Sequence, residues 1–192
     1  MKTKKLLFLA VIIMLMSLAI GYILFSTEEE YTVRSMDVSS PSHFDILFHR
    51  HGGVTYHHYG QGVQMYLAKF RRVEQILHEL VTGVTSVGAN TFSGSAVWGI
   101  TTSQGMPCEL RAIVKMGSAM GQNYFDISTI DFDFLSGASA GPFEGEQQIE
   151  IGTRYVLHLW QSGSMMRVGY DMFSPERLRD SEYTLILYLV FG

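Results

Sequence analysis

Cysteine is nearly absent from the chain: Cys108 is the only one among 192 residues. A single cysteine excludes an internal disulfide, so the stability of the fold must come from packing. Its position also excludes a lipoprotein, which needs a cysteine directly after an N-terminal apolar run. We expect Cys108 to be a small buried apolar residue.

Basic residues are scarce beyond the N-terminus. The whole chain has 14 Lys and Arg, and removing Lys2, Lys4 and Lys5 leaves eleven in residues 26–192. All 18 Asp and Glu lie in that part, which gives a formal charge of −7. This balance argues against nucleic acid as a partner and against docking on an anionic lipid surface.

Specific catalytic motifs are also lacking. No serine lies in a nucleophile-elbow pattern, and no glycine-rich phosphate loop is present. Arg50, His51 and Gly52 form a tripeptide that resembles the motif at the end of the first strand of the histidine phosphatases, with 44–49 as that strand. The resemblance covers these three residues, and the repeated parallel strand–helix units of that family are missing. We therefore favour a protein that is not an enzyme.

What the sequence does contain is a long charge-free run at residues 6–25, preceded by three lysines within residues 1–5. Twenty helical residues reach roughly 30 Å, the thickness of a bilayer's hydrocarbon core. Because lysines favour the cytoplasmic side, we predict a single-pass membrane anchor, with the rest of the chain extracytoplasmic. The alternative is a secretory signal sequence cleaved near Ser17 and Ala19, which would release the protein.

The remaining sequence predicts a polar stalk at 26–42 and one domain at 43–192. Apolar residues recur three and four apart between Val63 and Val81, which predicts a long amphipathic helix ending near Gly83. Most other segments favour strands. The predicted fold class is therefore α+β, with one long helix packed on a mostly antiparallel twisted sheet of hairpins.

Two hairpins stand out in the pattern. The first pairs 44–50 with 54–59 around a turn at His51–Gly53, and the second pairs 95–102 with 108–116. Further strands are expected at 124–134, 149–161 and 165–173, and 137–148 is expected to be a loop. Pro175 is placed to begin a helical turn, and the apolar run 183–191 predicts an interior strand.

Histidines are concentrated in the first hairpin, where five of the seven fall between His43 and His58. In a hairpin, His49 and His57 would face each other across two strands, close enough for imidazoles to share a zinc or copper ion. The candidate ligands are His49, His51, His57 and His58. The alternative is that these side chains are polar residues of a strand surface or loop edge, because His57 and His58 are neighbours that point to opposite faces.

Two function classes follow. The first is a membrane-anchored extracytoplasmic protein, bound to the bilayer through residues 6–25, whose domain binds another membrane or envelope protein without catalysis. The second is an extracytoplasmic zinc- or copper-binding protein that uses the histidine-rich segment 43–58. Neither the composition nor any motif identifies the partner.

Overall fold

The computed structural model describes residues 31–36, 50–103, 106–128, 130, 138–140, 145–162 and 172–192. The chain divides into two units, Met1–Glu30 and Tyr31–Gly192, and all described residues belong to the second. The elements of this unit are β1 (Thr32–Ser35), β2 (Arg50–Arg71), β3 (Glu74–Ser103), β4 (Met106–Met116), β5 (Ala119–Asp126), β6 (Ala138–Ala140), β7 (Glu146–Gln148), β8 (Arg154–Gln161), α3 (Pro175–Arg179) and β9 (Tyr183–Phe191).

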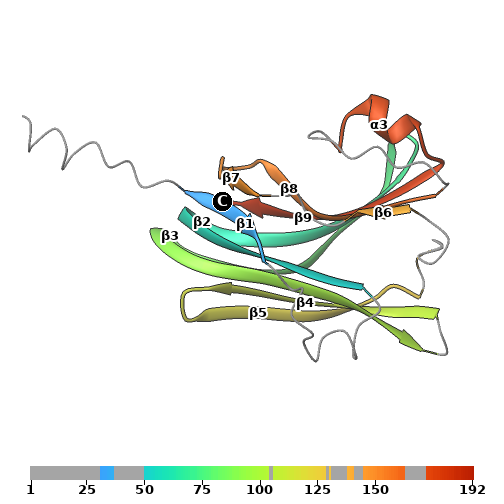
Figure 1. The fold of residues 1–192 in the computed structure, drawn as a ribbon. Coiled ribbons are helices and arrows are strands. Elements are labelled where there is room, and N and C mark those ends of the chain that lie inside the picture. Colours follow the sequence, from blue (N-terminus) through green and yellow to red (C-terminus); the bar gives the residue numbers. More distant parts are fainter. Residues whose placement is uncertain are drawn as a thin grey trace, which may run out of the picture. The chain divides into compact units, whose positions relative to one another are not determined.

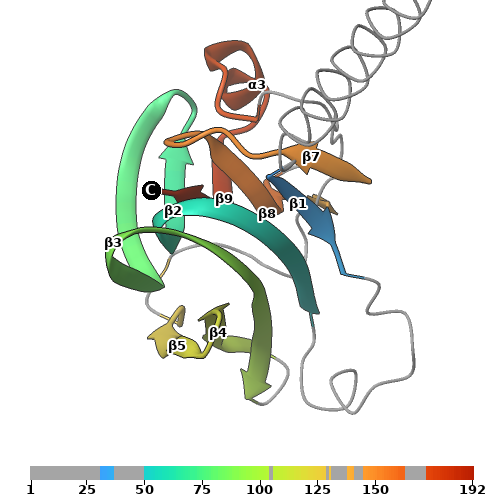
Figure 2. The ribbon, with the colours of Figure 1, turned by 90° about the vertical axis from the view of Figure 1, so that its left-hand side faces the viewer.

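The strands form one antiparallel sheet around the long β2–β3 hairpin. Its order is β5-β4-β3-β2-β9-β8-β6, and β1 pairs with both β2 and β7. Figures 1 and 2 show β2 and β3 curving continuously along their length. The first half of β2 pairs with β1 and the second half with β9, so the two ends of the hairpin belong to different layers.

The main core lies between these two layers. One layer contains β5, β4, β1, β7, the second half of β3 and the first half of β2. The other contains β6, β8, β9, the first half of β3 and the second half of β2. Aromatic contacts cross the interior: the ring centroids of Trp98 in β3 and Trp160 in β8 are 5.8 Å apart. Three leucines of β9, Leu185, Leu187 and Leu189, are fully buried in this core.

A second apolar cluster covers the outer face of the β9 layer. Leu178 of α3 and the preceding Met172 pack there on a row of strand residues. That row is Ala68, Phe70, Leu159, Ile186 and Tyr188. Ser174 caps α3, with its Oγ accepting a hydrogen bond from Arg177 N. β9 is therefore buried on both faces.

The bend of the hairpin is built at Gly60 and Gly62. Gly60 pairs with Asn90 and Gly62 pairs with Thr85, so four residues of β3 bulge out opposite a single residue of β2. A Cβ at Gly62 would lie 2.6 Å from the Val84 carbonyl oxygen. Glycine is therefore needed here because the two backbones approach too closely for a side chain.

The two layers are tied again where β5 returns to β3. The side-chain amide of Asn123 donates to the Val81 carbonyl oxygen at 2.7 Å. A Cβ at Gly121 would overlap the Gly83 carbonyl oxygen, so the two backbones touch at this point. We call this contact the β3–β5 seam.

The prediction of an α+β fold with a helix over 63–81 is wrong. Val63–Arg71 is the end of β2 and Glu74–Val81 is the beginning of β3, joined by a turn at Arg72 and Val73. Apolar residues of β2 fall on both faces because both are covered, and register shifts displace the phase in β3. Two-sided burial and bulges thus imitate a helical spacing. The turn has no glycine, and Arg72 takes the positive φ of 54° itself.

The glycine turn predicted at His51–Gly53 is also wrong, because these residues continue β2. Gly52 pairs with Trp98, and a Cβ on Gly52 would lie 3.0 Å from the Trp98 indole. This glycine makes room for an aromatic ring rather than for a change of direction. The predicted partner strand, 44–49, lies outside the described residues.

The membrane-anchor prediction is corrected as well. No helix in the described part of the chain is long and apolar enough to cross a membrane. The segment 6–25 on which the prediction depended lies outside the described residues. Part of the expected stalk, Thr32–Ser35, is strand β1 and pairs with β2 and β7.

Several strand predictions are confirmed. The hairpin of 95–102 with 108–116 is the β3–β4 pair, in which Ile100 lies opposite Leu110. The run 183–191 is β9, an interior strand between β2 and β8. Pro175 begins α3 as expected. The strand expected at 124–134 instead ends at Asp126, and the expected loop 137–148 contains β6 and β7.

Candidate functional site

Three of the four histidines predicted to bind metal lie on β2, whereas His49 is outside the described residues. His51 precedes His57 by six residues on one strand, about 20 Å at 3.3 Å per residue. His57 and His58 point to opposite faces, as expected for strand neighbours. Within the described ranges, no three His, Cys, Asp or Glu side chains could hold a metal ion together. A zinc or copper site that includes His49 stays a prediction.

The two adjacent histidines have structural partners. His57 Nδ1 lies 3.0 Å from Ser93 Oγ. His58 is 1% exposed and packs between Phe92 and Phe191, and its Nε2 lies 3.4 Å from the Gly192 carbonyl oxygen. Burial lowers the pKa of His58, which keeps the imidazole neutral. His58 therefore helps to fix the end of β9.

The tripeptide that resembles the histidine phosphatase motif is part of the β2 ladder. Arg50 pairs with Ile100 and His51 with Gly99, so neither residue lies in a loop after a strand. The fold around it is an antiparallel sheet rather than repeated parallel strand–helix units. The phosphoryl-acceptor role that the tripeptide implied has no support in this geometry.

A shallow hollow of about 410 Å³ is lined by Glu109, Tyr124, Asp126 and Ser128 at the ends of β4 and β5. Its two carboxylates already have partners. Asp126 accepts hydrogen bonds from the backbone and hydroxyl of Ser128, which lower the pKa of Asp126, and Glu109 pairs with Arg111. These are solvated acids with local partners, so the hollow does not present an acid–base pair.

The most distinctive surface feature is the free edge of β3 at Glu74–Leu80, which we call the β3 edge. In the described part of the chain, its backbone has a strand neighbour only on the β2 side. The β3–β5 seam marks one end of this segment, and the turn at Arg72 marks the other. Seven residues at 3.3 Å each give an edge of about 23 Å.

Two exposed side chains of the β3 edge, and that of Val73 in the turn before it, are large and apolar. Val73, Ile76 and Leu80 are 46%, 46% and 51% exposed. Large apolar side chains on an unpaired strand favour pairing with another chain. Between them, His78 is held in place: its Nε2 lies 2.7 Å from the Tyr188 hydroxyl, and its ring stacks on Tyr66.

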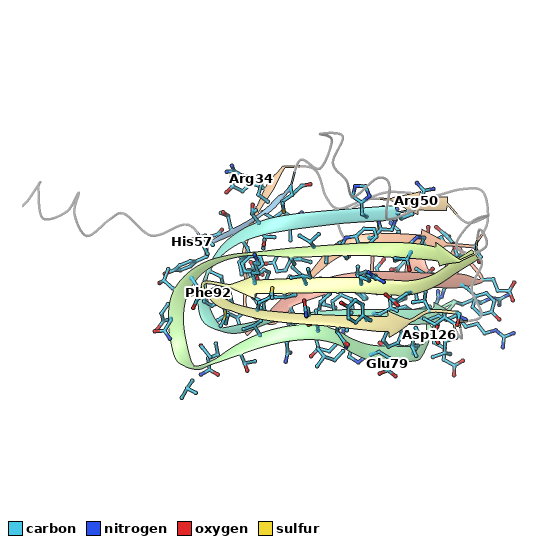
Figure 3. All side chains as sticks on the ribbon, turned by 90° about the horizontal axis from the view of Figure 1, so that it is seen from below. Arg34, Arg50, His57, Glu79, Phe92 and Asp126 are labelled. Atoms are coloured by element: carbon cyan, nitrogen blue, oxygen red, sulfur yellow. The ribbon has the colours of Figure 1, made fainter. Side chains whose placement is uncertain are left out.

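The charge of the β3 edge is negative. Glu74 and Glu79 are both exposed, and no Lys or Arg lies between Glu74 and Leu80. Figure 3 shows Glu79 and Asp126 toward the same end of the molecule, away from His57 and Phe92. The β3 edge therefore combines backbone groups that no other described strand pairs with, half-exposed apolar side chains and acidic groups.

Sequence reasoning missed this edge because it assigned the segment to a helix. The signal that could have identified it is the β-branched content from Val73 onward. Val73, Ile76, Val81, Thr82 and Val84 all favour strands over helices.

Comparison with known proteins gives no assignment: no family model, curated protein or solved structure matches this chain.

Proposed function

We propose that this chain is a non-catalytic binding protein that captures an extended segment of another protein along the β3 edge. The single observation that carries the proposal is a seven-residue edge whose backbone groups have no strand neighbour on one side within the described residues, together with half-exposed Ile76 and Leu80. An extended peptide adds to such an edge through main-chain hydrogen bonds, and its alternate side chains supply specificity.

The chemistry of the edge describes the partner. Glu74 and Glu79 favour a segment with Lys or Arg, and Ile76 and Leu80 favour apolar residues at alternate positions. The formal charge of −7 in residues 26–192 also attracts a basic partner at long range. The occupant is therefore a basic, extended segment with alternating apolar side chains.

The expected affinity is moderate. Each main-chain hydrogen bond contributes about 1 kcal/mol net. Covering the exposed halves of Ile76 and Leu80 contributes about 1 kcal/mol for each side chain. Loss of one apolar contact should therefore weaken binding by about fivefold, since 1.4 kcal/mol is a factor of ten.

The test uses a displayed library of random 12-residue peptides selected on the full chain. Enriched peptides should alternate apolar residues and carry Lys or Arg. Binding of a synthetic winner should weaken at least fivefold with Leu80→Lys or Ile76→Lys. The matched control is Val87→Lys, because Val87 is fully exposed at the bend and outside the β3 edge.

Backbone recognition needs its own readout. Two peptides should be compared, each N-methylated at one of the two alternate sets of backbone amides. One peptide should lose binding and the other should keep it, because only alternate amides face the β3 edge. Selected peptides that are insensitive to both edge variants would contradict the proposal. A full chain that dimerises, and becomes monomeric with Leu80→Lys, would instead show that the edge pairs with a second copy.

A further inference from the structure

The hollow at the ends of β4 and β5, which we call the β4–β5 hollow, combines an aromatic ring with two acids. Its volume is about 410 Å³, and its lining is Glu109, Tyr124, Asp126 and Ser128. Sites for small ligands span roughly 300–1,000 Å³ and present an apolar or aromatic surface with a few polar groups. The β4–β5 hollow therefore has the size and the mixed lining of a small-molecule site.

The strand register brings the two acids of the hollow together. Glu109 of β4 lies directly opposite Asp126 of β5, and the next pair on the same face is Arg111 with Tyr124. Side chains of directly opposite residues share one face of a sheet, and their Cβ atoms are about 4.5–5.5 Å apart. Like charges at such a pair destabilise the sheet, so the fold carries an electrostatic cost at this point.

Described neighbours neutralise only one of the two carboxylates. Glu109 Oε1 accepts a hydrogen bond from Arg111 Nε, so this acid has a cationic partner. Asp126 Oδ1 accepts from the hydroxyl and the backbone N–H of Ser128, and these hydrogen bonds lower the pKa of Asp126. Both of these donors are uncharged, so they favour the ionised carboxylate without cancelling its charge. Together, Glu109, Arg111 and Asp126 keep one net negative charge.

Tyr124 gives the hollow an aromatic surface beside these charges. Its side chain is 59% exposed and forms part of the lining. The guanidinium of Arg111 lies over the same ring, 5.2 Å from its centroid. Aromatic faces attract cations through the ring quadrupole, and this contact shows that Tyr124 already packs against one. An exposed ring also offers a flat apolar face on which another flat group can stack.

Charge and donor pattern define the chemistry of a ligand for this hollow. The carboxylates of Glu109 and Asp126 repel an anion and, being ionised, only accept hydrogen bonds. A bare metal ion is a poor fit, because no set of three His, Cys, Asp or Glu in the described part of the chain could hold one. A primary ammonium has three donors and one positive charge, which complements two acceptor groups with one net negative charge. A flat apolar group attached to it would cover the ring of Tyr124.

We infer that the β4–β5 hollow binds a small organic amine, with its ammonium group between the carboxylates of Glu109 and Asp126 and a flat apolar group against the ring of Tyr124. The ammonium neutralises the like-charge pair, so binding stabilises the folded chain. The hollow is formed by β4 and β5 and the proposed peptide edge by β3, so this inference does not depend on the proposed function.

The experiment titrates the full ¹⁵N-labelled chain with benzylamine, which carries a primary ammonium beside a flat ring. The backbone amide resonances of Tyr124, Asp126 and Ser128 should shift saturably, and the melting temperature should rise. Benzyl alcohol is the neutral counterpart and benzoate the anionic one, and both should bind at least threefold more weakly than benzylamine. Added sodium chloride should weaken benzylamine binding, because salt screens exposed charges.

Variants locate the binding. Asp126→Asn keeps an acceptor for Ser128 but removes the charge, and Tyr124→Ala removes the ring, so each should weaken benzylamine binding by about threefold. The matched control is Glu150→Gln, which removes one exposed negative charge outside the hollow and should leave binding unchanged.

The wild-type titrations decide between ligand classes. Nα-acetyl-lysine amide carries the same ammonium on a peptide-like molecule without a flat ring, and it should bind more weakly than benzylamine. Tighter binding of this lysine derivative would assign the hollow to a protein side chain and overturn the small-molecule inference. The inference would also fail if benzylamine gave no saturable shift, if benzyl alcohol bound equally well, or if the same resonances responded to calcium chloride alone.

Discussion

Acid should destabilise this protein through His158, and the size of the effect follows from its burial. Burial lowers the pKa of His158 from 6.5 to about 3 in the folded chain. In the unfolded chain the imidazole regains its ordinary pKa of 6.5, so below that pH the unfolded state binds the additional proton. Stability is therefore full above pH 6.5, declines as the pH falls, and stops declining near pH 3.

Each pKa unit corresponds to about 1.4 kcal/mol, so His158 should reduce the free energy of unfolding by about 2 kcal/mol between pH 7.5 and pH 5. The assay is urea unfolding of the wild type and of His158→Phe at both pH values. Other groups also titrate, so the measured quantity is the difference between the two pH dependences. His57→Gln is the matched control, because His57 is partly exposed on β2. Equal pH dependences in wild type and His158→Phe would refute the reasoning.

Three further substitutions test the packing of the two layers and the surface character of the β3 edge. Gly121→Ala should lower the free energy of unfolding by about 2–4 kcal/mol in urea titrations, because its Cβ overlaps the Gly83 carbonyl oxygen and strains the β3–β5 seam. The control Gln122→Ala, at the neighbouring exposed position, should change the free energy of unfolding by less than about 0.5 kcal/mol. An unchanged stability of Gly121→Ala would mean that the layers do not touch there. Leu187→Ala in fully buried β9 should cost about 2–5 kcal/mol by calorimetry or urea, and a loss below about 1 kcal/mol would contradict its place in the core. Leu80→Lys should change the free energy of unfolding by less than about 0.5 kcal/mol, since the side chain is half-exposed, and a large loss would show that Leu80 is part of the core.

Local patterns predicted the strands whose environment is simple. The β4 strand alternates because one face is core and the other is solvent: Leu110, Ala112 and Val114 are buried, while Arg111 and Lys115 are exposed. β9 was recognisable because an uninterrupted apolar run suits a strand buried on both faces. In both segments the sequence period matches the surroundings of the strand.

The long β2–β3 hairpin escaped prediction because its surroundings change along its length. The end of β2 is covered on both faces, and bulges shift the phase at the beginning of β3. No residue that typically forms turns marks Arg72 and Val73. Beside the four-residue bulge opposite Gln61, the backbone of Gly62 exchanges hydrogen bonds with Gly192 at the end of the chain. This contact joins residues that are distant in sequence, so no local pattern marks it.

Aromatic packing in the interior and the placement of the histidines depended even more on long-range contacts. Trp98 and His158 are sixty residues apart, and only the β8 bulge turns His158 toward Trp98. The histidine-rich segment was conspicuous by composition, yet the three described members lie along one strand and do not converge. The density of histidines in the sequence was therefore a poorer guide to their arrangement in space than the pairing of distant strands.

Residue-resolved amide hydrogen exchange along Leu77–Leu80 tests the central claim most directly. A strand paired on one side only should show alternation, with amides that face β2 exchanging slowly and those that face outward exchanging rapidly. Addition of a selected peptide should then slow the outward amides. Uniformly slow exchange across Leu77–Leu80 in the free chain would contradict the account, because it would mean either a helix or an edge that is already covered.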